Sequence, residues 1–209
     1  WAKENTREAI FDAMKRREVY ATTGSRIGVR FFGGWAFEEN DIFSPNYLDR
    51  GYSAGVPMGG DLTEAPKNTA PSFMIAAVKD PNGANLDRLQ IVKGWLDNKG
   101  QLREHVYDVA WSGERELDAE SGKLPAVGNT VDVDSATYAN TIGAASLATV
   151  WHDPQFDRKE RAFYYVRVLE IPVPRWTTYD AAYFDIDVPD GAPDSIQDRA
   201  YTSPIWYTP

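Results

Sequence analysis

The stretch AFYYVRVLEI, residues 162–171, decides the fold class of this sequence. Apolar residues occupy both faces of its first half when it is drawn as an extended chain, which is typical of a strand at the centre of a sheet. Pro172 and Pro174 then end the strand, because proline cannot donate a hydrogen bond to a sheet ladder. We therefore expect a β protein built around a central strand at 162–171.

The segments before this one supply further strands. Residues 27–32 and 72–79 both have strand-like patterns, and each ends at a turn rich in glycine or proline. Residues 89–95 and 106–111 are rich in β-forming side chains and are joined through the polar turn 97–100, which predicts a hairpin. The sequence thus predicts several strands that pair in antiparallel fashion.

The segments between the strands predict loops and little helix. The stretch 37–66 is rich in glycine, proline and aspartate, and 112–130 is likewise predicted to be a loop. A short helix is predicted at 144–151, where Leu147, Val150 and Trp151 would share one face. We expect a mainly β fold, an antiparallel β-sandwich with an N-terminal helix–strand unit and one or two short helices, because a sheet must cover its apolar face with a second layer.

The first residues predict a helix that leads into a strand. Asn5 is suited to be the N-cap with Glu8 in the first turn, and basic residues at 15–17 would face the negative end of the helix dipole. Residues 19–22 then switch to β-forming side chains. The helix would carry an apolar stripe at helical spacing, formed by Ala9, Ile10, Ala13 and Met14.

Composition excludes several functional classes. The formal net charge of −9 repels polyphosphates and anionic membranes, so we expect no nucleic-acid partner and no membrane partner. The longest apolar run, 73–78, is far shorter than the roughly 20 residues that a membrane helix needs. The absence of cysteine excludes disulfides, Cys-ligated zinc and thiol catalysis, and it fits either the cytoplasm or the periplasm.

Neither of the two histidines predicts a catalytic site. His105 is expected to be a packed or edge side chain, because it would share a strand face with Tyr107, Val109 and Trp111. His152 precedes Asp153, and this pair is too small for a catalytic zinc site, which normally takes three protein ligands. We assign no catalytic residue and no metal ligand.

Two pairs of acids raise the question of a calcium site. Asp132 with Asp134, and Asp185 with Asp187, would each place two carboxylates on one strand face. Such oxygen clusters can hold Ca²⁺, although a solvated sheet face explains them with fewer assumptions.

The segment 172–180 combines side chains suited to grip a polar ligand or another domain. Two prolines stiffen the chain in front of a cation, two large rings and a carboxylate, supplied by Arg175, Trp176, Tyr179 and Asp180. In the alternative interpretation, Arg175 pairs with an acid and Trp176 covers the core.

Six stretches in order carry a resemblance to a known family: ENTREAIFDAMKRREVYATTGSRI (4–27), GVPMGGDL (55–62), DPNGANLDRLQIVKGW (80–95), VYDVAWSGER (106–115), EIPVPRWTTYDA (170–181) and TSPIWYTP (202–209). The chain resembles, over its whole length, the C-terminal part of a bacterial family catalogued as a domain of unknown function, number 3604. Longer members of that family begin with a domain similar to the polymerase and histidinol phosphatase (PHP) metallohydrolases, which bind two or three metals through His, Asp and Glu. We therefore expect this chain to be the back part of a longer protein.

The resemblance implies a division of the chain. Residues 7–22 resemble the last helix and strand of PHP-like proteins, and 203–207 resemble the phrase that ends the β-rich region after them. This implies that 1–24 are the last helix and strand of an upstream PHP-like domain and that 25–209 are a β-sandwich accessory domain. The hydroxyl of Thr23 and the cation of Arg26 follow that strand, so the resemblance places them within reach of the upstream site.

The resemblance also implies a function. We expect a non-catalytic accessory domain of a PHP-like hydrolase, with no cofactor in this chain and a divalent metal in the upstream domain. Its partner would be that upstream domain, with self-association through the N-terminal helix as a further contact. The alternatives are a free-standing β-sandwich module that binds a carbohydrate or an acidic ligand through Arg175 and Trp176, and a small hydrolase with His152 and Asp153 at its site.

Overall fold

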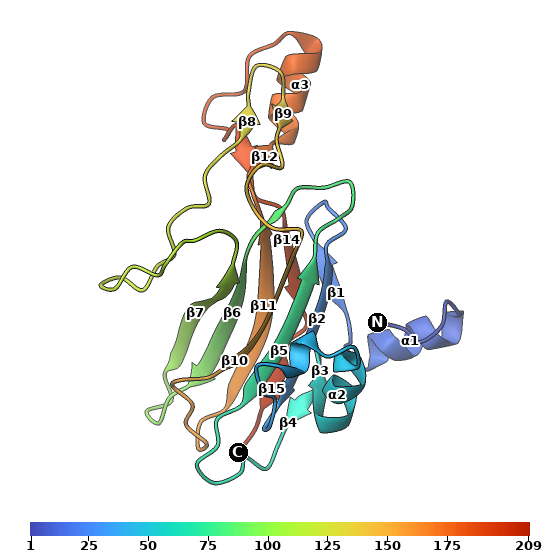
Figure 1. Cartoon of the computed structure of the whole chain (residues 1–209), viewed down its shortest axis with the longest axis vertical. Coiled ribbons are helices and arrows are strands. Elements are labelled where there is room, and N and C mark those ends of the chain that lie inside the picture. The colour runs from blue at the N-terminus through green and yellow to red at the C-terminus, as the bar shows by residue number, and fades with distance from the viewer.

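The computed structural model describes residues 1–209 and confirms the mainly β fold. Two sheets form the body of the molecule, and Figure 1 shows most of their strands running along its long axis. The larger sheet has seven strands: β1 (Tyr20–Thr22), β4 (Asp61–Leu62), β6 (Leu86–Leu96), β7 (Leu102–Trp111), β11 (Ala162–Glu170), β14 (Arg199–Thr202) and β15 (Ile205–Tyr207). The smaller sheet has four: β2 (Gly28–Gly34), β3 (Gly55–Pro57), β5 (Ser72–Val78) and β10 (Ser146–His152).

Strand β11 is the centre of the larger sheet, as its apolar pattern predicts. One edge of β11 pairs with β6 from Ala162↔Trp95 to Glu170↔Leu86. Its other edge is shared, because β14 pairs with residues 167–169 and β15 with residues 162–164. The predicted hairpin is confirmed as β6 and β7, and all pairs are antiparallel except the short one between β15 and β4.

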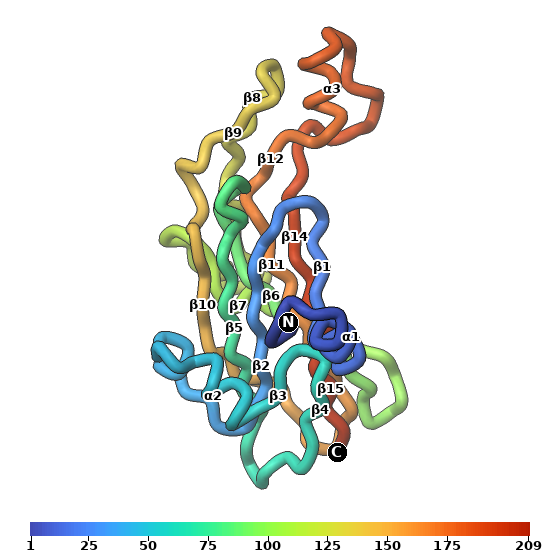
Figure 2. The backbone as a smooth tube through the Cα atoms, turned by 90° about the vertical axis from the view of Figure 1, so that its right-hand side faces the viewer, coloured from blue at the N-terminus to red at the C-terminus, as the bar shows by residue number.

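The core lies between the two sheets, which Figure 2 shows edge-on as two layers. Phe31 and Phe73 from the smaller sheet meet Tyr164 and Val166 from the larger one, and each of these residues is at most 1% exposed. The ring centroids of Phe73 and Tyr164 lie 4.5 Å apart. Alternation along each strand therefore places one set of side chains in a shared core, as in a β-sandwich.

The prediction of a helix at 144–151 is wrong, because these residues form strand β10. This strand pairs with β5 from Ser146↔Val78 to His152↔Ser72. Leu147 and Trp151 pack toward the sandwich core, whereas Val150 packs against the apolar cluster on the other side of the sheet. Both faces of the strand are covered, so its apolar residues occur at spacings that mimic a helix.

The prediction of a loop over 37–66 is wrong in part. The segment contains the 3₁₀ turn η1 (Asp41–Phe43), the helix α2 (Tyr47–Ala54), and strands β3 and β4. Helix α2 lies on the outer face of the smaller sheet, where Phe32 and Met74 are buried. A Cβ at Gly51 would lie 2.7 Å from the Phe32 ring, so the helix rests directly on this ring.

Helix α1 (Arg7–Lys15) forms as predicted but projects from the sandwich, on the right of Figure 1. Its N-cap is Thr6 rather than Asn5, since the Thr6 hydroxyl accepts a hydrogen bond from the amide of Ala9. The strand that follows is β1, which pairs with β14 at the edge of the larger sheet. None of the helices is long and apolar enough to cross a membrane.

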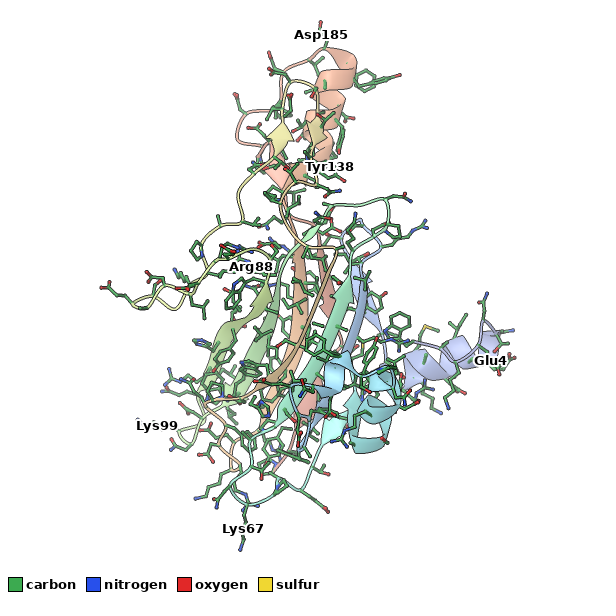
Figure 3. All side chains as sticks on the ribbon, in the orientation of Figure 1. Glu4, Lys67, Arg88, Lys99, Tyr138 and Asp185 are labelled. Atoms are coloured by element: carbon green, nitrogen blue, oxygen red, sulfur yellow. The ribbon has the colours of Figure 1, made fainter.

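A small lobe extends beyond one end of the sandwich, at the top of Figure 1. It contains β8 (Val131–Asp132), β9 (Thr137–Tyr138), β12 (Val173–Pro174), α3 (Trp176–Phe184) and β13 (Ser195–Ile196). Figure 3 labels Tyr138 near its base and Asp185 at its outer end. Ile171 and Val173 are buried at its base together with Ala84.

Candidate functional site

The loop at 23–26, which follows β1, gathers acidic side chains around it. The hydroxyl of Thr23 donates to Oδ1 of Asp198 at 2.7 Å and accepts from the amide of Arg199 at 3.0 Å. The amide of Arg26 donates to Oδ2 of Asp80 at 2.7 Å. The structure therefore brings Thr23 and Arg26 to one end of the sandwich, where the Arg26 side chain is exposed and forms no ion pair.

Glu170, at the end of β11, is the buried acid of this cluster. It is 1% exposed, and neither its Oε1 atom nor the buried hydroxyl of Ser25 has a hydrogen-bond partner. Burial raises the pKa of Glu170 to about 7, and the Asp198 and Asp80 carboxylates add to this rise. By contrast, the amides of Arg26 and Asn82 lower the pKa of Asp80, which therefore stays ionised beside Glu170.

Glu170 was not among the residues predicted for a site, although the sequence contains a signal for it. Alternation along β11 places Tyr164, Val166 and Val168 on the core face, and all three are fully buried. Glu170 follows Val168 by two residues and therefore lies on the same face of the strand, so the pattern places a carboxyl at the end of the core. The signal is weak because a strand end is usually solvated.

In the cluster at the 23–26 loop, Glu170 has a pKa of about 7 and can therefore gain or lose a proton near neutral pH, which is the property of a general acid or base. The cluster offers no activated nucleophile, since its hydroxyls come from Ser25 and Thr23 without a histidine beside them. The chain contains no group of three or more His, Cys, Asp or Glu side chains that could hold a metal ion.

Neither acid pair lies on one strand face, so that prediction is wrong. Asp132 ends strand β8, whereas Asp134 lies in the turn before β9. Asp185 is the C-cap of α3 with φ of 54°, in the left-handed region, and Asp187 follows outside any strand. Two residues that are two positions apart share a face only within a strand, and neither of these pairs lies within one.

The histidines do not form a site. His105 is an exposed side chain on the edge strand β7, as predicted, and its ring packs against Tyr107 at a tilt, with centroids 4.2 Å apart. The prediction that His105 shares a face with Trp111 is wrong. The β6–β7 register shifts between Leu89 and Gln90, so the side chains of β7 after this shift point to the opposite face from those before it. His152 is exposed, while the neighbouring Asp153 is buried.

The segment around Arg175 forms part of the lobe, between β12 and α3. Arg175 is the N-cap of α3 and forms no ion pair, and Trp176 is 64% exposed. The alternative in which Arg175 pairs with an acid and Trp176 covers the core is therefore wrong. Tyr179 and Asp180 are also exposed on α3, so these four residues are available for a contact.

Comparison with known proteins gives a family without an assigned activity. No curated protein matches the chain, and no solved structure matches it. One family model, described as a protein of unknown function (DUF3604), matches residues 1–209. The chain therefore belongs to the DUF3604 family.

Proposed function

We propose that this chain is a non-catalytic accessory domain of a larger, PHP-like metal-dependent hydrolase, and that α1 seats it against the neighbouring catalytic domain. The divalent metal and its ligands belong to that neighbouring domain in this proposal. The accessory domain supplies a rigid sandwich, the projecting helix and the loop at 23–26.

The observation that carries the proposal is the exposed apolar face of α1. Ile10 is 42% exposed, Met14 is 55% exposed and Phe11 is 59% exposed, while Ala13 is the one buried residue of the helix. Burying such side chains stabilises a protein by about 1.5–3 kcal/mol each. An isolated helix shorter than about 12–15 residues is marginal in water, so a nine-residue helix with this face gains most from a partner surface.

The connection from α1 to the loop at 23–26 indicates which part of this chain would face the neighbouring catalytic domain. Helix α1 leads within a few residues into β1, and β1 ends at Thr22, directly before Thr23 and Arg26. In this proposal α1 is the element shared with the catalytic domain, whereas β1 stays paired with β14 in the larger sheet. The exposed cation of Arg26 then lies on the edge that faces the neighbouring active site, while the carboxyl of Glu170 stays buried in the same acidic cluster.

A parallel assay of this chain and of the longer protein tests the proposal. We expect the longer protein to hydrolyse bis(p-nitrophenyl) phosphate with Mn²⁺ and the 209-residue chain to show no hydrolysis. Hydrolysis by this chain alone, or a stoichiometric divalent metal that it retains after dialysis against a chelator, would overturn the proposal.

A substitution tests the placement of Arg26 separately. In the longer protein, Arg26→Ala should lower kcat/KM by about tenfold or more, because a cation that faces the site stabilises developing negative charge. Lys99→Ala, at the far tip of the β6–β7 hairpin in Figure 3, is the matched control and should leave the rate unchanged. Equal rates for the wild type and Arg26→Ala would remove Arg26 from the proposal.

A further inference from the structure

We propose that the outer face of the larger sheet binds a neutral oligosaccharide in a groove between the β6–β7 hairpin and β15. The groove has a volume of about 560 Å³, within the range of about 300–1,000 Å³ that is usual for small-molecule sites. It is formed by the end of the sheet that Lys99 marks in Figure 3. It is separate from Arg175 and Trp176, which lie in the lobe.

The floor of the groove is a row of three paired residues across the sheet. Phe163 of β11 pairs with Gly94 of β6 on one side and with Trp206 of β15 on the other. A Cβ at position 94 would lie 2.3 Å from Cζ of Phe163, so glycine is what lets the ring lie flat across the strand. The centroids of Phe163 and Trp206 lie 5.3 Å apart, and Trp206 is 42% exposed.

The aromatic surface continues along β11. The rings of Phe163 and Tyr165 are nearly parallel, with an interplanar angle of 11° and centroids 6.5 Å apart. Leu96 and Leu102, which pair at the end of the hairpin, are 40% and 87% exposed and form an apolar wall. Exposed rings and leucines gathered in one groove indicate a binding surface, because single surface apolar residues are usually scattered.

The rim of the groove carries both donors and an acceptor. Arg161 and Glu104 are exposed and form no ion pair or side-chain hydrogen bond, so both are free to bind a ligand. Arg103 is held in place by Asp97 at 3.0 Å and by Gln101 at 2.6 Å. Two guanidinium groups with two nearby carboxylates give a rim of almost no net charge.

A sugar ring matches this combination. Its apolar C–H face stacks on an aromatic ring, while its hydroxyl groups donate to a carboxylate and accept from a guanidinium. The balanced rim gives no preference for an anion, and the net charge of −9 on the whole chain repels acidic glycans. The ligand class that fits is therefore a neutral oligosaccharide.

Calorimetric titration of the 209-residue chain with neutral hexasaccharides tests the proposal. The probes are β-1,4-glucan, β-1,3-glucan, α-1,4-glucan, xylan, mannan and chitin fragments. We expect at least one of them to bind, and Trp206→Ala to weaken that binding by about tenfold or more through the lost stacking surface. Tyr183→Ala removes a ring in the lobe that is 83% exposed, so it is the control and should leave the affinity unchanged.

Three outcomes would overturn the proposal. The first is no binding of any of the six probes at millimolar concentration by wild-type protein that melts cooperatively. The second is binding that Tyr183→Ala abolishes and Trp206→Ala leaves intact. The third is tighter binding of hexagalacturonate than of every neutral probe. Because this assay uses neither metal nor a neighbouring domain, its failure is distinguishable from failure of the accessory-domain proposal.

Discussion

The ammonium group of Lys93 lies 2.6 Å from a carboxylate oxygen of Asp153, and both side chains are almost completely shielded from solvent. Lys93 projects into the sandwich from β6 of the larger sheet, and Asp153 follows β10 of the smaller sheet. The Tyr164 hydroxyl donates to the same carboxylate oxygen at 2.7 Å, and the carbonyl of Gln155 accepts from Lys93 at 2.8 Å. This network joins the two layers, and it holds Asp153 in the core while the neighbouring His152 is exposed.

Breaking this buried pair should cost much stability. Asp153→Asn leaves the Lys93 charge buried without its counter-ion, so we expect the free energy of unfolding to fall by about 3–5 kcal/mol. Urea denaturation at pH 7 measures the difference. The control is Asp61→Asn, which breaks the exposed pair with Arg17 and should cost less than about 1 kcal/mol. Similar losses in both variants would contradict a buried role for the Lys93–Asp153 pair.

Glu170 should make the stability of the protein fall as the pH rises. Its pKa is about 7 in the folded state, against an ordinary value of 4.5 that applies when the chain is unfolded. Between these values the folded state holds a proton that the unfolded state has released, so the free energy of unfolding decreases from about pH 4.5 to about pH 7. Below this window Glu170 is protonated in both states and costs no stability. Above it the carboxyl is ionised in both states, and the full cost of a buried charge lowers the free energy of unfolding.

Glu170→Gln removes the cost of ionising a buried side chain, because the amide cannot ionise. We expect the variant to be more stable than the wild type at pH 8, by about 1–3 kcal/mol, and nearly equal to it at pH 4.5. Urea denaturation at the two pH values measures both differences. Glu116→Gln, an exposed acid in the long loop after β7, is the control and should show no such contrast. A variant that is no more stable at pH 8 would show that Glu170 is not a strained acid.

A side chain at position 94 should destabilise the protein, because it would displace the Phe163 ring. Gly94→Ala places a Cβ against this ring, and we expect a loss of about 1–3 kcal/mol in the free energy of unfolding as the ring is displaced. Gly28→Ala is the matched control within β2, because the nearest atom to its new Cβ would be 4.0 Å away. Thermal denaturation of both variants measures the contrast. Equal melting temperatures would mean that Phe163 does not depend on Gly94.

The strands of the sandwich could be predicted because their signals are local. The β6–β7 hairpin has β-forming residues on both sides of a polar turn, and the apolar faces of β11 mark it as central. The register shift at Leu89/Gln90 could not be predicted, since it depends on how two long strands twist together. That shift moves Trp111 away from the face of His105.

The missed elements depend on tertiary contacts. Helix α2 has no side-chain N-cap and rests on Phe32, a residue that precedes it by more than ten positions. Strand β10 is covered on both faces, so Leu147 and Val150 serve different apolar clusters. The acidic cluster at the 23–26 loop depends on chain segments that are distant in sequence, since Thr23 meets Asp198 and Arg26 meets Asp80. A local pattern cannot contain such contacts.

The most direct test of the central claim compares one double variant in two proteins. Phe11→Ser with Met14→Ser changes two exposed residues in the 209-residue chain, so its free energy of unfolding should change by less than about 0.5 kcal/mol there. In the longer protein the same residues would be buried against the catalytic domain, and we expect a loss of about 3 kcal/mol or more. Lys15→Gln on the same helix should be neutral in both proteins. An equally small change from the double variant in the two proteins would contradict the docking of α1.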